Sequence, residues 1–211
     1  MSSDVKKRSG RPVDPAKREA IIAAATRAFF DRGFAAASIE QVAADAGVSK
    51  VTVYNHFGDK RRLFVASVET QCEMMRGHSS IGETPRGPLR ERLLAIGEAM
   101  VAFLSRDEMV QFERRIAAET EHEPEIGKAF LAAGPHRMKK AFSALISALD
   151  EAGELRVDDP ELAAEQFAAM CKGMGDLDRR FSQPIDEKRN RERIEGAVEV
   201  FCRAYATRGT C

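Results

Sequence analysis

The sequence lacks the features that mark membrane and exported proteins. None of its apolar runs approaches the roughly 20 residues that a helix needs to span a bilayer, and its start carries no signal-peptide pattern. Hydrophobic residues make up 44% of the 211 residues and charged residues 31%, which is ordinary for a soluble chain. We therefore expect a cytoplasmic protein without a membrane partner, long enough for one or two domains.

The motifs of common enzyme classes are also absent. The chain has no nucleophile elbow, phosphate-binding loop or zinc motif, and no paired spacing of His and carboxylate residues. Gly173 and Gly175 form a Gly-x-Gly pair, but no predicted strand precedes them, so they are not a dinucleotide-binding fingerprint. The sequence therefore predicts a protein that is not an enzyme and uses no cofactor.

Cysteine and histidine are few and widely spaced. There is no C-x-x-C pair, so in a chain without a secretion signal we expect reduced thiols, with Cys171 and Cys202 at helical core positions. A redox switch remains an alternative. The histidines lack metal-ligand spacing, and we expect no metal site. The residues concerned are Cys72, Cys171, Cys202, Cys211, His56, His78, His122 and His136.

The zero net charge hides an asymmetry along the chain. Residues 1–65 hold 12 Lys and Arg against 7 Asp and Glu, whereas the remaining residues hold 21 against 26. A basic first part attached to an acidic second part is typical of a nucleic-acid-binding domain joined to a domain that does not bind nucleic acid.

The most informative stretch runs from Ser38 to Phe64, SIEQVAADAGVSKVTVYNHFGDKRRLF. Ser38 and Gln41 form a capping box, in which the Ser38 hydroxyl accepts from a free amide and Gln41 reaches back. A helix therefore begins at Ile39, and Gly47 ends it in the left-handed conformation. The chain then turns sharply toward Ser49.

Ser49 caps the next helix, which buries Val53 and Phe57 one turn apart and leaves a polar free face. Two helices joined by a turn that contains glycine, the second short and polar, form the helix-turn-helix pattern. Such a helix fits the major groove of DNA, where side chains near its start reach base edges.

The base-edge candidates lie at the start of this second helix. Lys50 is suited to donate to guanine, and Val51 or Thr52 to pack on a thymine methyl. Tyr54 is a further base-edge candidate, but Tyr54, His56 and Lys60 are better suited to bind phosphates. Lys60 lies in the first turn of a helix capped by Asp59, where free amides suit an anion. The predicted DNA contacts are Ser38, Gln41, Lys50, Val51, Thr52, Tyr54, Asn55, His56, Lys60 and, from the preceding segment, Arg11.

The segment GVSKVTVYNHFGDKRRLF resembles the signature of the TetR/AcrR family of bacterial transcriptional repressors, and the preceding ASIEQVAADA is similar to the family's second helix. The match covers residues 16–68. It departs at Val51, where Gly, Pro or Ala is more usual. The resemblance implies that Thr52, Tyr54, His56 and Lys60 occupy DNA-contact positions. The C-terminal half is similar to the AefR-like domain of this family.

Residues 1–13 are predicted to be a flexible basic arm. Ser9-Gly10-Arg11-Pro12 is similar to the centre of an AT-hook, with Ser in place of the first Arg, so the arm could lay Arg11 in the minor groove. The alternative is a solvated tail. Asp14 and Pro15 then begin a helix that ends at Gly33. We assign residues 14–60 to the DNA-binding domain.

The rest of the chain, residues 61–211, is helical in pattern, with no strand alternation. We predict an all-α fold of about nine or ten helices, in which the helix from Lys60 links a three-helix DNA-binding domain to a helical ligand-binding and dimerisation domain. Breaks fall at a Gly- and Pro-rich loop before Pro88, at Pro124, at Gly134-Pro135, at Gly153 and around Pro184.

A ligand pocket is implied mostly by the family resemblance. Apolar stripes on helices usually pack into the hydrophobic core. Phe and Met side chains on several helices could, however, converge on an adaptable apolar cavity. The predicted pocket residues are Met100, Phe103, Phe112, Phe130, Met138, Phe142, Phe167, Met170 and Met174. Arg114, Arg115, Glu119 or His136 could orient the ligand.

The resemblance also implies a homodimer formed by the last two long helices, with Ala169, Gly173, Val198, Phe201 and Tyr205 at the interface. Two copies would read consecutive major grooves of a near-palindromic operator. The function expected is a homodimeric repressor of transcription that a small, apolar effector releases from double-stranded DNA. The alternatives are a thiol- or metal-responsive regulator on the same scaffold and a constitutive DNA binder without an effector.

Overall fold

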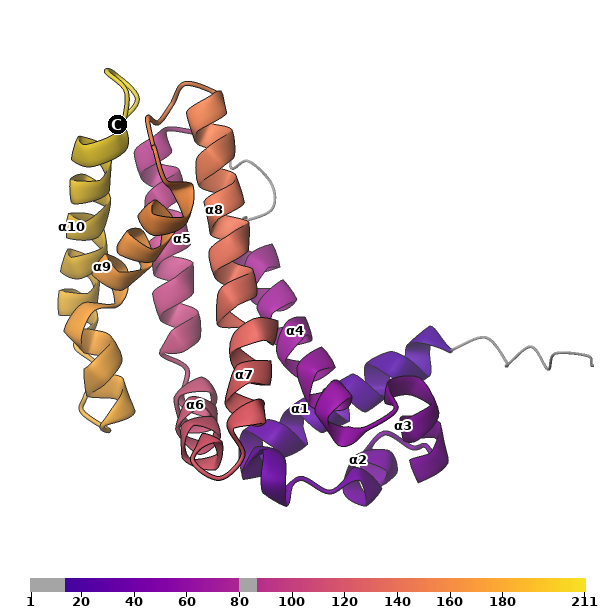
Figure 1. The fold of residues 1–211 in the computed structure, drawn as a ribbon. Helices are drawn as coiled ribbons and strands as arrows, with labels where there is room; N and C mark the ends of the chain where they lie inside the picture. Colours follow the sequence, from indigo (N-terminus) through magenta and orange to yellow (C-terminus); the bar gives the residue numbers. More distant parts are fainter. Residues whose placement is uncertain (1–13, 80–86) are drawn as a thin grey trace, which may run out of the picture.

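The computed structural model describes residues 14–79 and 87–211, apart from the side chains of residues 75–79 (Figure 1). This part of the chain forms ten α-helices and no strand, with one isolated bridge between Leu155 and Ala206. The predicted all-helical fold is confirmed. No helix in this part is long and apolar enough to cross a membrane. The helices are α1 (Pro15–Ala36), α2 (Ile39–Asp45), α3 (Lys50–Phe57), α4 (Lys60–Ser79), α5 (Leu89–Leu104), α6 (Asp107–Thr120), α7 (Pro124–Ala133), α8 (Pro135–Glu151), α9 (Pro160–Arg180) and α10 (Glu187–Tyr205).

Helices α1 and α9 begin at the capping residues that the sequence predicted. The Asp14 carboxylate accepts from the amide of Ala16 at 3.1 Å at the start of α1, and Asp159 accepts from Leu162 at 3.0 Å at the start of α9. Proline follows each cap, where its missing N–H has no helical partner to lose. These caps fix both helix starts locally.

Two helices are interrupted by glycine. Gly33 in α1 has φ +82° and ψ 179°, so the helix breaks at the residue where the sequence predicted its end, although one more turn follows. Gly173 in α9 has φ +46° and ψ −149°, and Figure 1 shows the bend of α9. Both backbone conformations are accessible mainly to glycine.

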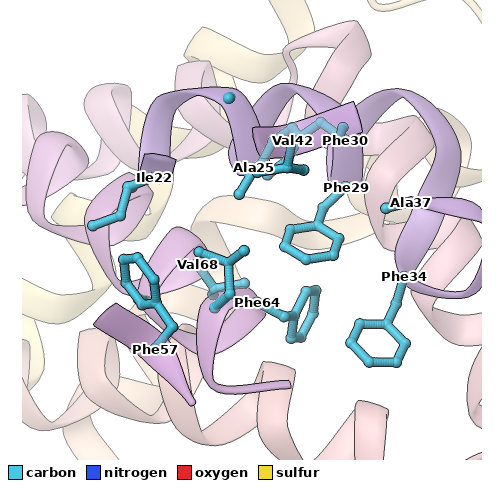
Figure 2. Packing of buried hydrophobic residues seen from close by; sticks show 14 of the residues in the cluster. Ile22, Ala25, Phe29, Phe30, Phe34, Ala37, Val42, Phe57, Phe64 and Val68 are labelled. Atoms are coloured by element: carbon cyan, nitrogen blue, oxygen red, sulfur yellow. The ribbon is translucent and has the colours of Figure 1, made fainter. Parts of the chain in front are cut away.

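The first hydrophobic core is shared between α1–α4 and two later helices, α6 and α7. Phe29 packs edge-on against Phe64 at a ring-centroid distance of 5.3 Å (Figure 2), and Phe30 stacks on Phe112 of α6 at 4.1 Å. Because Phe112 and Ile116 of α6 complete this core, the packing does not divide at residue 60.

The second hydrophobic core lies between α5, α8, α9 and α10, which run beside one another (Figure 1). Phe167 is its centre, with ring centroids 5.2 Å from Phe142 and 5.3 Å from Phe201. Met138 of α8 packs against both cores. The two cores therefore meet along α8.

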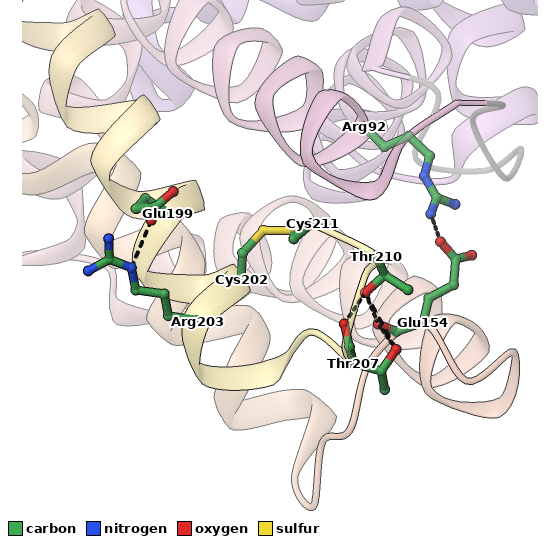
Figure 3. Close-up of a disulfide and its surroundings, with 8 residues drawn as sticks. All are labelled: Arg92, Glu154, Glu199, Cys202, Arg203, Thr207, Thr210 and Cys211. Atoms are coloured by element: carbon green, nitrogen blue, oxygen red, sulfur yellow. Dashed lines mark hydrogen bonds and ion pairs between the residues drawn. A yellow bond between two sulfur atoms is a disulfide. The ribbon is translucent and has the colours of Figure 1, made fainter.

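The expectation that all four cysteines are reduced is wrong for two of them. Cys202 and Cys211 form a disulfide with Cα atoms 5.9 Å apart, as Figure 3 shows, while Cys72 and Cys171 are free and buried. The pairing arises because the C-terminal segment turns back. The Glu154 carbonyl accepts from the Thr207 amide and the Thr210 hydroxyl, each at 3.1 Å, which brings Cys211 to α10.

Candidate nucleic-acid interface

The start of α2 follows half of the predicted capping box. The Ser38 hydroxyl accepts from the Gln41 amide at 3.3 Å, as expected. The Gln41 side chain does not reach back, because it donates forward to Asp45 at 2.8 Å, one helical turn away. The second half of the capping-box prediction is therefore wrong, and Gln41 remains exposed at the helix start.

The turn between α2 and α3 is built as predicted. Gly47 has φ +65°, and the Val48 amide donates back to the Ala43 carbonyl at 2.9 Å, which closes the turn. Ser49 then accepts from the Thr52 amide at 3.1 Å and starts α3. Val53 and Phe57 are buried and anchor α3 on the first core.

The free face of α3 carries the predicted base-edge side chains. Val51 is 66% exposed, an unusual environment for an apolar side chain, and Tyr54 and Asn55 are also exposed. The Thr52 hydroxyl is within 2.9 Å of the Ser49 hydroxyl. His56 is half-buried, and its Nδ1 atom has no hydrogen-bond partner in the described part of the chain.

Lys50 is paired within the protein. Its ammonium group donates to the Glu40 carboxylate of α2 and lies 5.9 Å from the centre of the Tyr54 ring. The hydrogen bond from Lys50 lowers the pKa of Glu40 to about 2 and raises the pKa of Lys50. Sequence reasoning missed Glu40, which lies ten residues away. The ion pair with Glu40 therefore competes with any contact between Lys50 and a base.

Lys60 is held by the segment that follows α1. Its Nζ atom donates to the Ala35 carbonyl at 3.0 Å and lies 4.8 Å from the centre of the Phe34 ring. Burial lowers its pKa, while the Glu119 and Glu123 carboxylates of the second half act in the opposite direction. Asp59 caps α4 by accepting from Arg62 at 2.8 Å, as predicted. An ammonium has three N–H donors, so Lys60 keeps donors for a phosphate.

One predicted contact, Arg11, lies outside the described residues. The others come together at one end of the molecule, on α2, α3 and the start of α4 (Figure 1). Ser38 and Gln41 lie at the start of α2, where free backbone amides suit a phosphate. The roles of all these residues as DNA contacts stay predictions.

Comparison with known proteins matches two family profiles. Residues 21–67 match "Bacterial regulatory proteins, tetR family", and residues 91–207 match "AefR-like transcriptional repressor, C-terminal domain". The chain belongs to the TetR family. It is therefore a DNA-binding transcriptional regulator of the helix-turn-helix type and not an enzyme.

Individual relatives agree over nearly the whole chain. The HTH-type transcriptional regulator BetI of Rhizobium meliloti (strain 1021) is 26% identical over 91% of this chain and 92% of that protein. A TetR-family regulator from Mesorhizobium loti MAFF303099 superposes with a TM-score of 0.76, at 27% identity, over 96% of this chain and all of that one. The flavonoid-responsive regulator FrrA superposes with a TM-score of 0.72, at 27% identity, over 93% and 100%.

The predicted pocket residues of the TetR-family chain fall into the two cores. Phe103, Phe112 and Phe130 belong to the first core, and Met100, Phe142, Phe167 and Met170 to the second, with Met138 in both. Phe112 and Phe167 are buried against neighbouring rings. Met174 is 63% exposed beyond the break in α9 and belongs to neither core, so its place in a ligand pocket stays a prediction.

The predicted polar ligand contacts are engaged elsewhere. Arg115 donates to the Phe30 carbonyl of α1, and Glu119 accepts from backbone amides that follow Gly33. Arg114 donates to the Arg179 carbonyl at 2.5 Å and to the Ser182 hydroxyl, and His136 is exposed. These side chains join helices to one another, a use that helical spacing does not reveal.

Two cavities in the described part are lined by residues outside the predicted set. One of about 380 Å³ lies between α1 and α4 and includes Arg18, Ile22 and Thr70. The other, of about 170 Å³, lies at the turn between α9 and α10 and includes Arg179, Arg189 and Arg193. In the same part, no group of three or more His, Cys, Asp or Glu residues could hold a metal ion.

The predicted interface residues divide between the surface and the core. Ala169 and Gly173 are exposed, and Tyr205 is half-buried, with its hydroxyl bonded to Gln166 at 2.8 Å. Val198 and Phe201 are fully buried in the second core, so their assignment to an interface is wrong. Their apolar stripe packs α10 on its own chain, and the opposite face of α10 carries the exposed Val200.

Proposed function

We propose that this TetR-family regulator is a homodimeric repressor that binds a near-palindromic operator and is released by a small, apolar ligand. The observation that carries the proposal is an unusual distribution of exposed apolar side chains. Of the ten large hydrophobic residues exposed in the described part, six lie on α9, α10 or the turn between them. They are Leu162, Met174, Leu177, Phe181, Ile185 and Val200.

These exposed apolar side chains support self-association through α9 and α10. Phe181 is 71% exposed, and burying side chains of this size in a partner stabilises an interface. Ala169 and Gly173 on the same helix leave room for a close approach. A dimer also explains specificity, because one short α3 makes few base contacts, and two copies about 34 Å apart read successive major grooves.

The dimer is tested with a charge at its proposed centre. We expect Leu177→Asp to raise the dimer dissociation constant by about 100-fold, because a carboxylate would be buried without a partner. Leu131→Asp is the matched control, since Leu131 is a similarly exposed leucine on α7. Sedimentation of the wild type as a monomer at micromolar concentration would contradict the proposal.

Operator recognition is assigned to Lys50, Val51, Thr52 and Tyr54, with Asn55, His56, Lys60, Ser38 and Gln41 beside them. Supporting this, the exposed face of α3 carries donors, a ring and an apolar group, as base edges and thymine methyls require. Selection of genomic fragments by the full chain is expected to recover a near-palindrome. Recovery without sequence preference would overturn the specific-repressor proposal.

The basic arm is proposed to add a minor-groove contact through Arg11. Deleting residues 1–11 removes Lys6, Lys7, Arg8 and Arg11. We expect weaker operator binding and a smaller dependence on salt, because fewer phosphates are neutralised. An unchanged affinity and salt slope would contradict the contact.

The ligand is proposed to enter where the two cores meet along α8. Met138 packs on both cores and is only partly buried, and an unbranched thioether adapts to an inserted group. The name of the similar regulator FrrA points to flavonoids, so a panel of planar aromatic compounds is the probe. A compound that raises the melting temperature should also release operator DNA.

A matched pair of variants tests the position of this site. We expect Met138→Trp to weaken binding of the active compound at least tenfold, because the larger indole would compete with the compound between the two cores, while Leu131→Trp on the α7 surface should not. If no compound in the panel shifts the melting temperature or releases DNA, the constitutive binder is favoured instead.

A thiol-responsive regulator is a second candidate that the Cys202–Cys211 disulfide favours. Burial raises the pKa of Cys72 to about 11 and that of Cys171 to about 12, so both remain neutral thiols and poor nucleophiles at physiological pH. Any thiol response would therefore run through Cys202 and Cys211. This candidate would be supported over the apolar ligand if the wild type loses operator binding on reduction and if Cys202→Ser does not respond to reduction.

A further inference from the structure

The backbone groups on both sides of the break in α1 form hydrogen bonds with one neighbouring helix, α6. In an uninterrupted helix the Phe34 amide would donate to the Phe30 carbonyl. Gly33 prevents this, and α6 supplies both missing partners: Arg115 donates to the Phe30 carbonyl, and Glu119 accepts from the Phe34 amide at 3.1 Å. Arg115 and Glu119 are one turn apart on the same face of α6.

The Glu119 carboxylate packs closely against the backbone at the break. The same Glu119 oxygen also accepts from the Ala35 amide at 3.1 Å, so one carboxylate oxygen holds two consecutive amides. A Cβ atom added at Gly33 would overlap the other Glu119 oxygen. Hydrogen bonds that involve an ionised group are stronger than neutral ones, and both side chains are partly buried.

The residues that this pair holds lead directly into the reading helices. Ala35 is the next point of attachment, because its carbonyl accepts from Lys60 at the start of α4. Ala37 is buried in the first core, and Ser38 then starts α2. The direction in which α2 and α3 leave α1 is therefore set at the residues that Glu119 binds.

The same helix is also fixed to the far end of α9. Arg114, adjacent to Arg115, donates to the Arg179 carbonyl and to the Ser182 hydroxyl. Consecutive residues of α6 therefore hold the segment before the reading helices and the end of the helix whose exposed apolar side chains we assign to the dimer.

We propose that Arg115 and Glu119 are positioning residues that fix the orientation of α2 and α3 relative to the second half of the chain. Both residues act through backbone groups of Phe30, Phe34 and Ala35. The consequence for operator choice, a strict spacing between half-sites, rests on the proposed function, but the positioning itself does not.

The test compares Glu119→Ala with Glu119→Gln and with Glu121→Ala in the full chain. Glu119→Gln keeps an acceptor oxygen, and Glu121→Ala removes the same charge from an exposed position two residues away. Genetically encoded spin labels at Val51 on α3 and Lys140 on α8, both exposed, report the orientation within one chain diluted with unlabelled protein.

We expect Glu119→Ala to broaden the distribution of distances between the labels, and amide exchange at Phe34 and Ala35 to quicken about tenfold or more, the equivalent of one charge-assisted hydrogen bond. Glu121→Ala should match the wild type, and Glu119→Gln should lie close to it. A distribution in Glu119→Ala that equals that of Glu121→Ala would overturn the proposal, even if the melting temperature falls.

Operator spacing supplies the second readout. The wild type should bind an operator more weakly when its half-sites are moved by one or two base pairs. In Glu119→Ala this loss of affinity should be smaller, while the affinity for a single half-site should be unchanged. Unchanged discrimination would overturn the proposed role in spacing. If the labels respond while the wild type binds no operator specifically, the positioning stands and the proposed function fails.

Discussion

The two broken helices of this regulator place the same backbone event in opposite surroundings. In α1, Gly33 is buried, and charged side chains of α6 replace the hydrogen bond that the break removes. In α9, Gly173 is exposed, and the Arg193 side chain of α10 lies over it, where an added Cβ would come within 2.6 Å of the Arg193 Cδ atom.

The two breaks differ in how far their backbone geometry can change. The Gly33 break is surrounded by partners that cannot move without losing hydrogen bonds, so its geometry is fixed. The Gly173 break is covered by the Arg193 side chain, whose guanidinium donates to Asn190 on its own helix α10, so the geometry of this break is less constrained. A fixed break suits the segment that directs the DNA-reading helices, and an adjustable one suits an exposed surface that meets a partner.

The largest effect is expected from Gly33→Ala. Its φ of +82° strains any residue with a Cβ, and the new methyl group would displace Glu119 from the Phe34 and Ala35 amides. We expect the free energy of unfolding to fall by about 4 kcal/mol, from backbone strain together with lost charge-assisted hydrogen bonds. Urea unfolding of the full chain at fixed protein concentration measures this.

Gly47→Ala is the matched control for strain without a clash, because Gly47 has φ +65° and open space around its Cα atom. It should cost only about 1 kcal/mol. Equal losses for the two variants would mean that Glu119 contributes nothing at the break.

A smaller effect is expected from Gly173→Ala. The backbone strain remains, but the Arg193 side chain can shift at the cost of its hydrogen bond to Asn190, so we expect a loss of about 2 kcal/mol. The same urea titration measures it. Gly196→Ala on α10, a helical position with open space, should be neutral or stabilising by up to about 1 kcal/mol. A loss for Gly173→Ala as large as that for Gly33→Ala would remove the contrast between the breaks.

The smallest effect is expected from Glu40→Gln, which removes the exposed ion pair between Glu40 and Lys50. Because Lys50 lowers the Glu40 pKa from 4.5 to about 2, the stabilisation by the pair is complete above pH 4.5 and is lost as the pH falls toward 2. The urea midpoint at pH 7 should hardly change, since exposed pairs contribute little.

DNA binding should respond to the same substitution. Lys50 released from Glu40 can contact a phosphate or a base, so we expect severalfold tighter binding at low salt and a salt slope steeper by about 0.9. Fluorescence anisotropy over a range of salt concentrations measures the slope, with Glu121→Gln as the control for the removed charge. An unchanged slope would show that Lys50 stays away from DNA.

Features set by neighbours in sequence could be predicted, and features set by distant contacts could not. The caps at Asp14 and Ser49 and the turn at Gly47 follow from local backbone chemistry, and the structure has each of them. The contact between Glu119 and the Phe34 amide spans 85 residues, and no local pattern encodes it.

The same limit explains the remaining errors. A stripe such as Val198 and Phe201 is apolar whether it packs on its own chain or on another, so periodicity cannot assign it. The Cys202–Cys211 pair depends on a C-terminal segment that returns to Glu154. The Gln41 side chain could accept from the Ser38 amide or donate to Asp45, and only the structure identifies Asp45 as its partner.

The shared first core determines where this protein can be recombined with its relatives. A chimera that exchanged only residues 1–60 would set a foreign α1 against Phe112, whose ring stacks on Phe30, and against the Arg115 and Glu119 side chains that follow it on α6. The unit that can be grafted intact is α1–α4 together with α6 and α7, even though α5 separates them along the chain. Specificity transplanted with fewer helices would carry its reading surface without the contacts that orient it.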